Sequence, residues 1–195
     1  MTVPTPTLSL RRLDLGSDAD RPALDALVHR GAVPDPGVRD AVRALLDEIR
    51  VDPSRGVRAA SARFGGGPAD GRILLGRVEL EAARDRLDPT ARQALEQAIE
   101  HVTRFAEAQR PRTTTTTITD GIEIERRWEP LDSVGAYVPG GSAPYPSSLL
   151  MTVAPARVAG VGRVVVASPA GAEGRPDDIV LGAAGLLGVD TFVVA

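Results

Sequence analysis

A loop rich in glycine and proline, residues 137–148, carries the residues whose types and spacing best suit chemistry. It reads Tyr-Val-Pro-Gly-Gly-Ser-Ala-Pro-Tyr-Pro-Ser-Ser. A short apolar strand is predicted before it and a helix after it, and ligands of open α/β sheets bind beyond the carboxyl ends of the strands. Gly140 and Gly141 permit backbone conformations and close approaches that a side chain would block. The loop is therefore placed to face a ligand.

The start of the following helix is the second part of the predicted site. Ser147 or Ser148 is expected to cap this helix. The free backbone N–H groups of its first turn, together with the helix dipole, favour an anion such as a pyrophosphate. Neither the loop nor the rest of the chain contains a G-x-G-x-x-G fingerprint. Residue types alone therefore also allow a simpler interpretation, in which the glycines turn the chain and Ser147 only caps a helix.

Other residues capable of metal or acid–base chemistry are few. Zinc in a catalytic site takes three protein ligands drawn from His, Glu, Asp and Cys, whereas this chain has two His and no Cys. His101 is expected on the solvated face of a helix, and His29 near a helix end, where a cation is mildly favoured. Neighbouring acids are read as solvated or helix-capping groups, namely Asp47-Glu48, Asp177-Asp178 and the pair Glu123 and Glu125. No catalytic residue and no metal ligand is predicted.

The composition narrows the class of protein. The 195 residues are 43% hydrophobic and 25% charged, with a net charge of −3, and the pI is near 5.5. Arginine supplies all the basic charge because the chain has no lysine. An acidic chain without a basic stripe argues against nucleic acid as the main partner. No uninterrupted run of about 18 apolar residues predicts a membrane span, and no secretory signal is visible, so we expect a soluble cytoplasmic protein.

The first two thirds of the chain predict helices followed by a hairpin. Residues 1–10 are expected to form a flexible tail. Apolar spacing and breakers predict helices over 23–30, 37–50, 55–64, 78–87 and 89–109, the last with Asp88 as N-cap and Pro89 at its first position. Two runs of β-branched residues, 113–118 and 122–128, flank Asp120-Gly121, which predicts a β-hairpin. Residues 11–130 are thus expected to form a helical region plus a hairpin.

The last third alternates strands and helices. Strands are predicted over 134–138, 163–168 and 191–195, with helices over 147–159 and 176–187, the first of them broken or irregular near Pro155. This order indicates an α/β fold in which residues 131–195 form a βαβαβ half of a Rossmann-like parallel sheet. The predicted domain is incomplete, because the outer edge of its last strand is expected to be unpaired.

The same region resembles one enzyme family. Residues 134–141 read Val-Gly-Ala-Tyr-Val-Pro-Gly-Gly and are followed by Ser-Ala-Pro, by Pro-Ser-Ser before Met151, and by Pro-Ala before Ala159-Gly160. So many matches in one register resemble the cofactor-binding segment of histidinol dehydrogenases. The resemblance is strong from Pro130 onward and looser back to about Arg39.

That resemblance implies a function and a cofactor. Enzymes of this family oxidise L-histidinol to L-histidine in two NAD-dependent steps and hold a zinc ion that binds substrate. It implies that Tyr137 contacts NAD, by stacking or through its hydroxyl. With the loop and helix start, the predicted cofactor-binding residues are Tyr137, Pro139, Gly140, Gly141 and Ser147.

The resemblance also implies what this chain lacks. In the family the zinc ligands, the catalytic Glu-His pair and a further NAD contact lie in later segments, so the chain is expected to be a truncated form that is inactive alone. Two alternatives remain: a non-catalytic nucleotide-binding module derived from the family, and a structural subunit that completes itself as a homodimer.

Overall fold

The computed structural model describes residues 12–29, 36–140, 143–171 and 173–194. The chain divides into two compact units, one ending at Glu48 and one starting at Ile49. The first unit contains α1 (Arg21–Val28) and most of α2 (Pro36–Val51), close to the helices predicted there. The predicted tail, residues 1–10, lies outside the described residues.

Three helices precede the hairpin in the second unit: α3 (Pro53–Phe64), α4 (Arg77–Asp85) and α5 (Pro89–Gln109). The Asp88 carboxylate accepts hydrogen bonds from the backbone N–H groups of Thr90 at 2.9 Å and Ala91 at 3.1 Å, with Pro89 in the first turn. The predicted cap of α5 is therefore confirmed. No helix in the described ranges is both long and apolar enough to cross a membrane.

The predicted hairpin is also confirmed. Strands β2 (Thr114–Thr119) and β3 (Ile122–Arg126) pair antiparallel. They are joined at Asp120-Gly121, where Gly121 has a φ of +80° that favours glycine. Every residue of both strands is exposed. The hairpin is thus held by its own ladder and turn.

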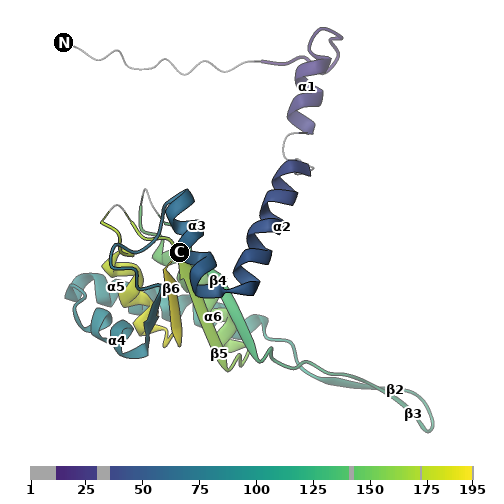
Figure 1. Ribbon diagram of the computed structural model, residues 1–195. Coiled ribbons are helices and arrows are strands. Elements are labelled where there is room, and N and C mark those ends of the chain that lie inside the picture. The colour runs from purple at the N-terminus through teal and green to yellow at the C-terminus, as the bar shows by residue number, and fades with distance from the viewer. Residues whose placement is uncertain (1–11, 30–35, 141–142, 172, 195) are drawn as a thin grey trace, which may run out of the picture. The chain divides into compact units, whose positions relative to one another are not determined.

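The last third of the chain folds as the predicted βαβαβ unit. Strands β4 (Ser133–Tyr137), β5 (Arg163–Ser168) and β6 (Thr191–Val194) are parallel, and α6 (Pro146–Val158) and α7 (Asp178–Leu186) connect them (Figure 1). The helix α6 continues through Pro155, so the predicted break is wrong. Proline there removes one N–H, whose acceptor would be the carbonyl of Met151. Met151 is exposed, so water can bind that carbonyl.

A fourth strand corrects the prediction for the sheet edge. Strand β1 (Leu74–Gly76) pairs antiparallel with β6, with Leu74 opposite Val193 and Gly76 opposite Thr191. The sheet order is β1-β6-β5-β4, and the sheet is mixed. The expectation that the outer edge of β6 is unpaired is therefore wrong. The predicted boundary at residue 130 falls inside the second unit, and the division into domains stays a prediction.

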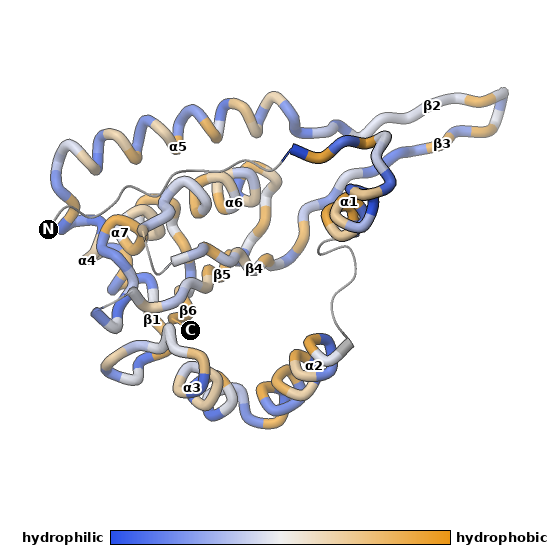
Figure 2. The backbone as a smooth tube through the Cα atoms, turned by 90° about the horizontal axis from the view of Figure 1, so that it is seen from above, coloured by the Kyte–Doolittle hydropathy of each residue, from blue (hydrophilic) through white to orange (hydrophobic). Residues whose placement is uncertain are grey.

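Only one face of the sheet is well buried. Val164, Val166 and Phe192 alternate with less buried neighbours and are 0% exposed. Figure 2 shows α6 and α7 on the same side of the row of strands, with α5 outside them. The hydrophobic core lies between these helices and the strands.

Helix α4 packs closely on α7 because α7 carries small residues where the two helices meet. A Cβ on Gly182 would lie 2.5 Å from the Leu87 side chain, and a Cβ on Gly185 would overlap the carbonyl oxygen of Leu80. Leu80 itself is 1% exposed. Gly185 thus sets how near α4 comes to α7, and Gly182, one turn away, makes room for Leu87, which follows α4.

An aspartate at the opposite end of the strands from the loop 137–148 links four elements. The Asp190 carboxylate, just before β6, accepts hydrogen bonds from Arg77 at 2.6 Å, from Arg157 at 3.0 Å and from the backbone N–H of Val164 at 3.0 Å. These bonds, led by that of Val164, lower the pKa of Asp190 from 3.8 to about 2. Asp190 therefore joins α4, α6 and β5 to the start of β6.

The packing of α4 on α7 gives the first prediction. Gly185→Ala should lower the free energy of unfolding by about 1–3 kcal/mol, because the new methyl group meets backbone that cannot move alone. Thermal and urea unfolding measure the loss. Gly135→Ala is the matched control, since a Cβ there meets nothing within 4 Å and should change stability by less than about 0.5 kcal/mol. Equal effects of the two changes would contradict the packing argument.

Asp190 gives the second prediction, on pH. The pKa of Asp190 is lower in the folded chain than in the unfolded chain. Its contribution to the free energy of unfolding is therefore present above the ordinary carboxyl range and is lost as the pH falls from about 4 to about 2. Asp190→Asn should lower the free energy of unfolding by about 1–2 kcal/mol at pH 6. In urea titrations, the difference in the free energy of unfolding between the Asp190→Asn chain and the unaltered chain should shrink towards pH 2. Asp120→Asn in the hairpin turn is the control, and a gap that stays constant with pH would refute the assignment.

Candidate functional site

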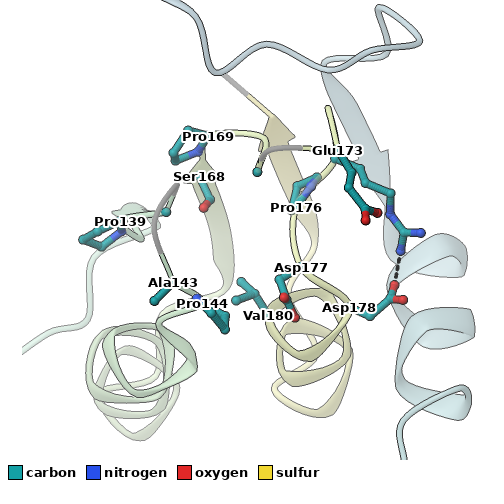
Figure 3. A pocket seen from close by; sticks show the side chains of 13 residues that line it. Pro139, Ala143, Pro144, Ser168, Pro169, Glu173, Pro176, Asp177, Asp178 and Val180 are labelled. Atoms are coloured by element: carbon teal, nitrogen blue, oxygen red, sulfur yellow. Dashed lines mark hydrogen bonds and ion pairs between the residues drawn. The ribbon is translucent and has the colours of Figure 1, made fainter. Parts of the chain in front are cut away.

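The carboxyl ends of β4 and β5 open onto a cavity of about 380 Å³. Its walls are the loop from β4 towards α6, the loop after β5 and the first turn of α7 (Figure 3). Nucleotide ligands of doubly wound sheets bind at this edge, beyond the strand ends. The cavity is therefore the candidate site.

The two loops touch at Gly140. A Cβ on Gly140 would lie 3.1 Å from Cγ of Pro169, closer than side chains normally pack. The φ of Gly140 is not among the positive values of the chain, so glycine is needed here for space and not for a left-handed turn. Sequence reasoning allowed both explanations, and the structure selects the close approach.

The structure separates the predicted cofactor residues. Pro139 and Gly140 line the cavity. Tyr137 ends β4, is 66% exposed as a residue, and lies on the face of the sheet opposite the half-buried Val134 and Ala136. Ser147 is exposed in the first turn of α6 and does not line the cavity. Gly141 lies outside the described residues.

The two helices that begin near the cavity differ at their N-termini. Helix α6 has Tyr145 at the cap position, no side-chain cap and no acidic residue in its first turn. The prediction that Ser147 or Ser148 caps α6 is wrong, because Pro146 takes the first helical position and both serines fall inside the helix. Helix α7 is capped by the Asp177 carboxylate, which accepts from the backbone N–H of Ile179 at 2.9 Å.

The wall at α7 is acidic. Asp177, Asp178 and Glu173 line the cavity together with one cation, Arg175. The Arg175 guanidinium is paired with Asp178 (Figure 3). The negative charge at α7 thus disfavours an anion there, whereas the first turn of α6 carries no such charge. Hydroxyl groups suit the carboxylates of this wall, because an ionised carboxylate only accepts hydrogen bonds.

Ser168 is a site residue that sequence reasoning missed. It ends β5, lines the cavity and is 3% exposed. Its hydroxyl points into the space bounded by Pro144, Asp177 and Val180 (Figure 3). The signal was its spacing, because it follows Val164 and Val166 at the period of the buried face and is the only polar residue of that series.

Metal ligands do not gather in the described part of the chain. No three His, Asp or Glu side chains there could hold a metal ion. The Nδ1 atom of His29 is 2.8 Å from the backbone oxygen of Asp25, and His101 is exposed on α5. The described residues therefore do not fit a zinc ion, and no chemical step is assigned to one here.

Comparison with known proteins then decides the family. The family model for histidinol dehydrogenase matches residues 28–195. This chain belongs to the histidinol dehydrogenase family. It is 40% identical over 185 residues to the histidinol dehydrogenase of Leifsonia xyli, and 41% identical over 192 residues to that of Nocardia farcinica. These alignments cover 93% and 95% of this chain but 42% of each relative, so the chain spans less than half of their length.

A solved structure supports the fold. The histidinol dehydrogenase crystal structure from Elizabethkingia anophelis matches with a TM-score of 0.75 at 23% identity, over 88% of this chain and 39% of that one. At this identity the match supports the arrangement of helices and strands alone. The resemblance inferred from residues 134–160 is thereby confirmed at the level of family and fold.

Proposed function

We propose that this chain forms part of the NAD site of a histidinol dehydrogenase, an oxidoreductase that converts L-histidinol to L-histidine in histidine biosynthesis. One observation carries the proposal. The cavity at the carboxyl ends of β4 and β5 is built by the loop that holds the family's motif. Membership of the family supplies the reaction, and the position of the cavity supplies the role of this part of the chain.

The polarity of the cavity fits a dinucleotide. The carboxylates at α7 suit sugar hydroxyls, and the side of the cavity at the loop from β4, away from those carboxylates, is left for the pyrophosphate. When bound, NAD supplies the hydride acceptor. The chain's own residues bind and orient it, with Gly140 keeping the two loops close enough to form one wall.

Tyr137 extends the proposed site beyond the cavity. The residue is 66% exposed at the end of β4, two residues before Pro139, which lines the cavity. A rigid ring at this position offers an apolar face for stacking and a hydroxyl for hydrogen bonding. We propose that it contacts the part of NAD that leaves the cavity.

Zinc, substrate and oligomeric state are proposed from the family alone. We propose that the whole enzyme holds zinc and histidinol with residues other than those described here, acts in the cytoplasm and forms a homodimer. A non-catalytic nucleotide-binding module is the second candidate, favoured by a cavity without a metal-binding group among the described residues.

NAD titration of the 195-residue chain tests the cofactor role. We expect saturable binding in calorimetry or NMR, weakened about 5- to 30-fold by Tyr137→Ala, because stacking contributes about 1–2 kcal/mol. Tyr137→Phe keeps the ring and separates stacking from hydroxyl bonding. Trp128→Ala is the control, an exposed aromatic residue after the hairpin. Binding that none of these changes alters would remove Tyr137 from the site.

A turnover assay tests the second half of the proposal. We expect this chain to form no NADH from L-histidinol and NAD with added zinc, because the described residues offer no zinc-binding group. Absorbance at the NADH band, against a full-length family member as positive control, measures the outcome. Steady zinc-dependent turnover would contradict the assignment of zinc to residues other than those described.

A further inference from the structure

We propose that the Ser168 hydroxyl hydrogen-bonds a ribose hydroxyl of the bound nucleotide and is a cofactor-positioning contact. The inference rests on the proposed function, because it names the part of the cofactor that the cavity holds. It adds a residue on β5 to a site otherwise assigned to the loop after β4.

The burial of Ser168 is the first observation. Only 3% of the residue is exposed, on the helix-covered face of the sheet. No hydrogen bond joins its hydroxyl to another described residue, and no enclosed polar side-chain atom of the described residues lacks a partner, so the hydroxyl is not sealed off from solvent; the residue lines the cavity. Alanine would fit the same space, so the hydroxyl at the end of this buried series offers a hydrogen-bonding group to a molecule that enters the cavity.

The direction of the hydroxyl is the second observation. It points into the cavity, which Pro144, Val180 and Asp177 also line (Figure 3). One oxygen of the Asp177 carboxylate accepts the hydrogen bond that caps α7, and its other oxygen can accept a hydrogen bond from a ligand. A hydroxyl and a carboxylate on one side of a cavity match a vicinal diol, which both donates and accepts.

The charge of the cavity wall at α7 indicates whether a sugar or a phosphate group of the nucleotide binds next to Ser168. Three carboxylates and one arginine line this end of the cavity, and Asp178 is paired both with that arginine and with Arg86. That balance opposes a phosphate next to Ser168 and favours neutral hydroxyls. The ribose therefore lies at Ser168 and Asp177, and the phosphates lie on the side of the loop from β4, away from the carboxylates.

The ribose contact is tested by removing the Ser168 hydroxyl from the protein and the 2′,3′-diol from the ligand. The ligands are NAD, AMP and 2′,3′-dideoxy-AMP, titrated by NMR. Ser168→Ala should weaken NAD and AMP about 5- to 30-fold and leave the dideoxy nucleotide unchanged. The melting temperature of the Ser168→Ala chain should not fall below that of the unaltered chain, because the hydroxyl has no hydrogen-bond partner among the described residues to lose. Thr191→Val, a hydroxyl deletion in the half-buried first residue of β6, should change no affinity.

The outcomes separate the two proposals. If AMP shows the Ser168 effect and NAD does not bind, the proposed function fails and the ribose contact stands. If NAD binds and Ser168→Ala weakens AMP and its dideoxy form equally or neither of them, the ribose contact is wrong. A melting temperature several degrees lower would also overturn it, because the hydroxyl would then have a structural partner.

Discussion

The close approach of α4 to α7 is the constraint on which much of the second unit depends. Strand β1 ends at Gly76 and α4 begins at Arg77, so the helix and the strand are positioned together. The N-terminus of α4 is fixed by Glu79, which accepts from the backbone N–H of Gly76 at 2.5 Å. That bond, and a second one from Arg72, lower the pKa of Glu79. Once α4 lies on Gly185, and Leu87 after it lies on Gly182, β1 reaches β6 and Arg77 reaches Asp190.

Much of this fold follows from local patterns, and the rest does not. The helix α5, the hairpin and the strands β4, β5 and β6 each show a periodicity or a turn signal within a few residues. Strand β1 does not, because three residues ending in glycine show no alternation, and its partner is far along the chain. A proline also misled the prediction for α6, since Pro146 starts the helix one residue before Ser147.

The candidate site, like the fold, could be predicted only in part from local sequence patterns. The loop after β4 could be predicted from its glycines and prolines and from a family resemblance. The spacing of Ser168 could place it on the buried face, but its role could not be predicted, because a Val-Val-Val-Ala-Ser run is typical of an ordinary buried strand. Its hydroxyl matters only after α6 and α7 have enclosed the space at the end of β5. The acidic wall of α7 is likewise a tertiary property, since Asp177 and Asp178 alone read as an ordinary helix start.

The pairing of β1 with β6 also dictates an order of folding. The two strands lie more than a hundred residues apart in the chain, and closing so long a loop delays a contact. During synthesis β1 leaves the ribosome long before β6 exists, so Leu74 and Leu75 have no strand partner until β6 has been made. The β2–β3 hairpin needs no distant residue and can form before β6 has been synthesised. The nascent chain is therefore most exposed to chaperones and to misassembly in the interval between the emergence of β1 and that of β6.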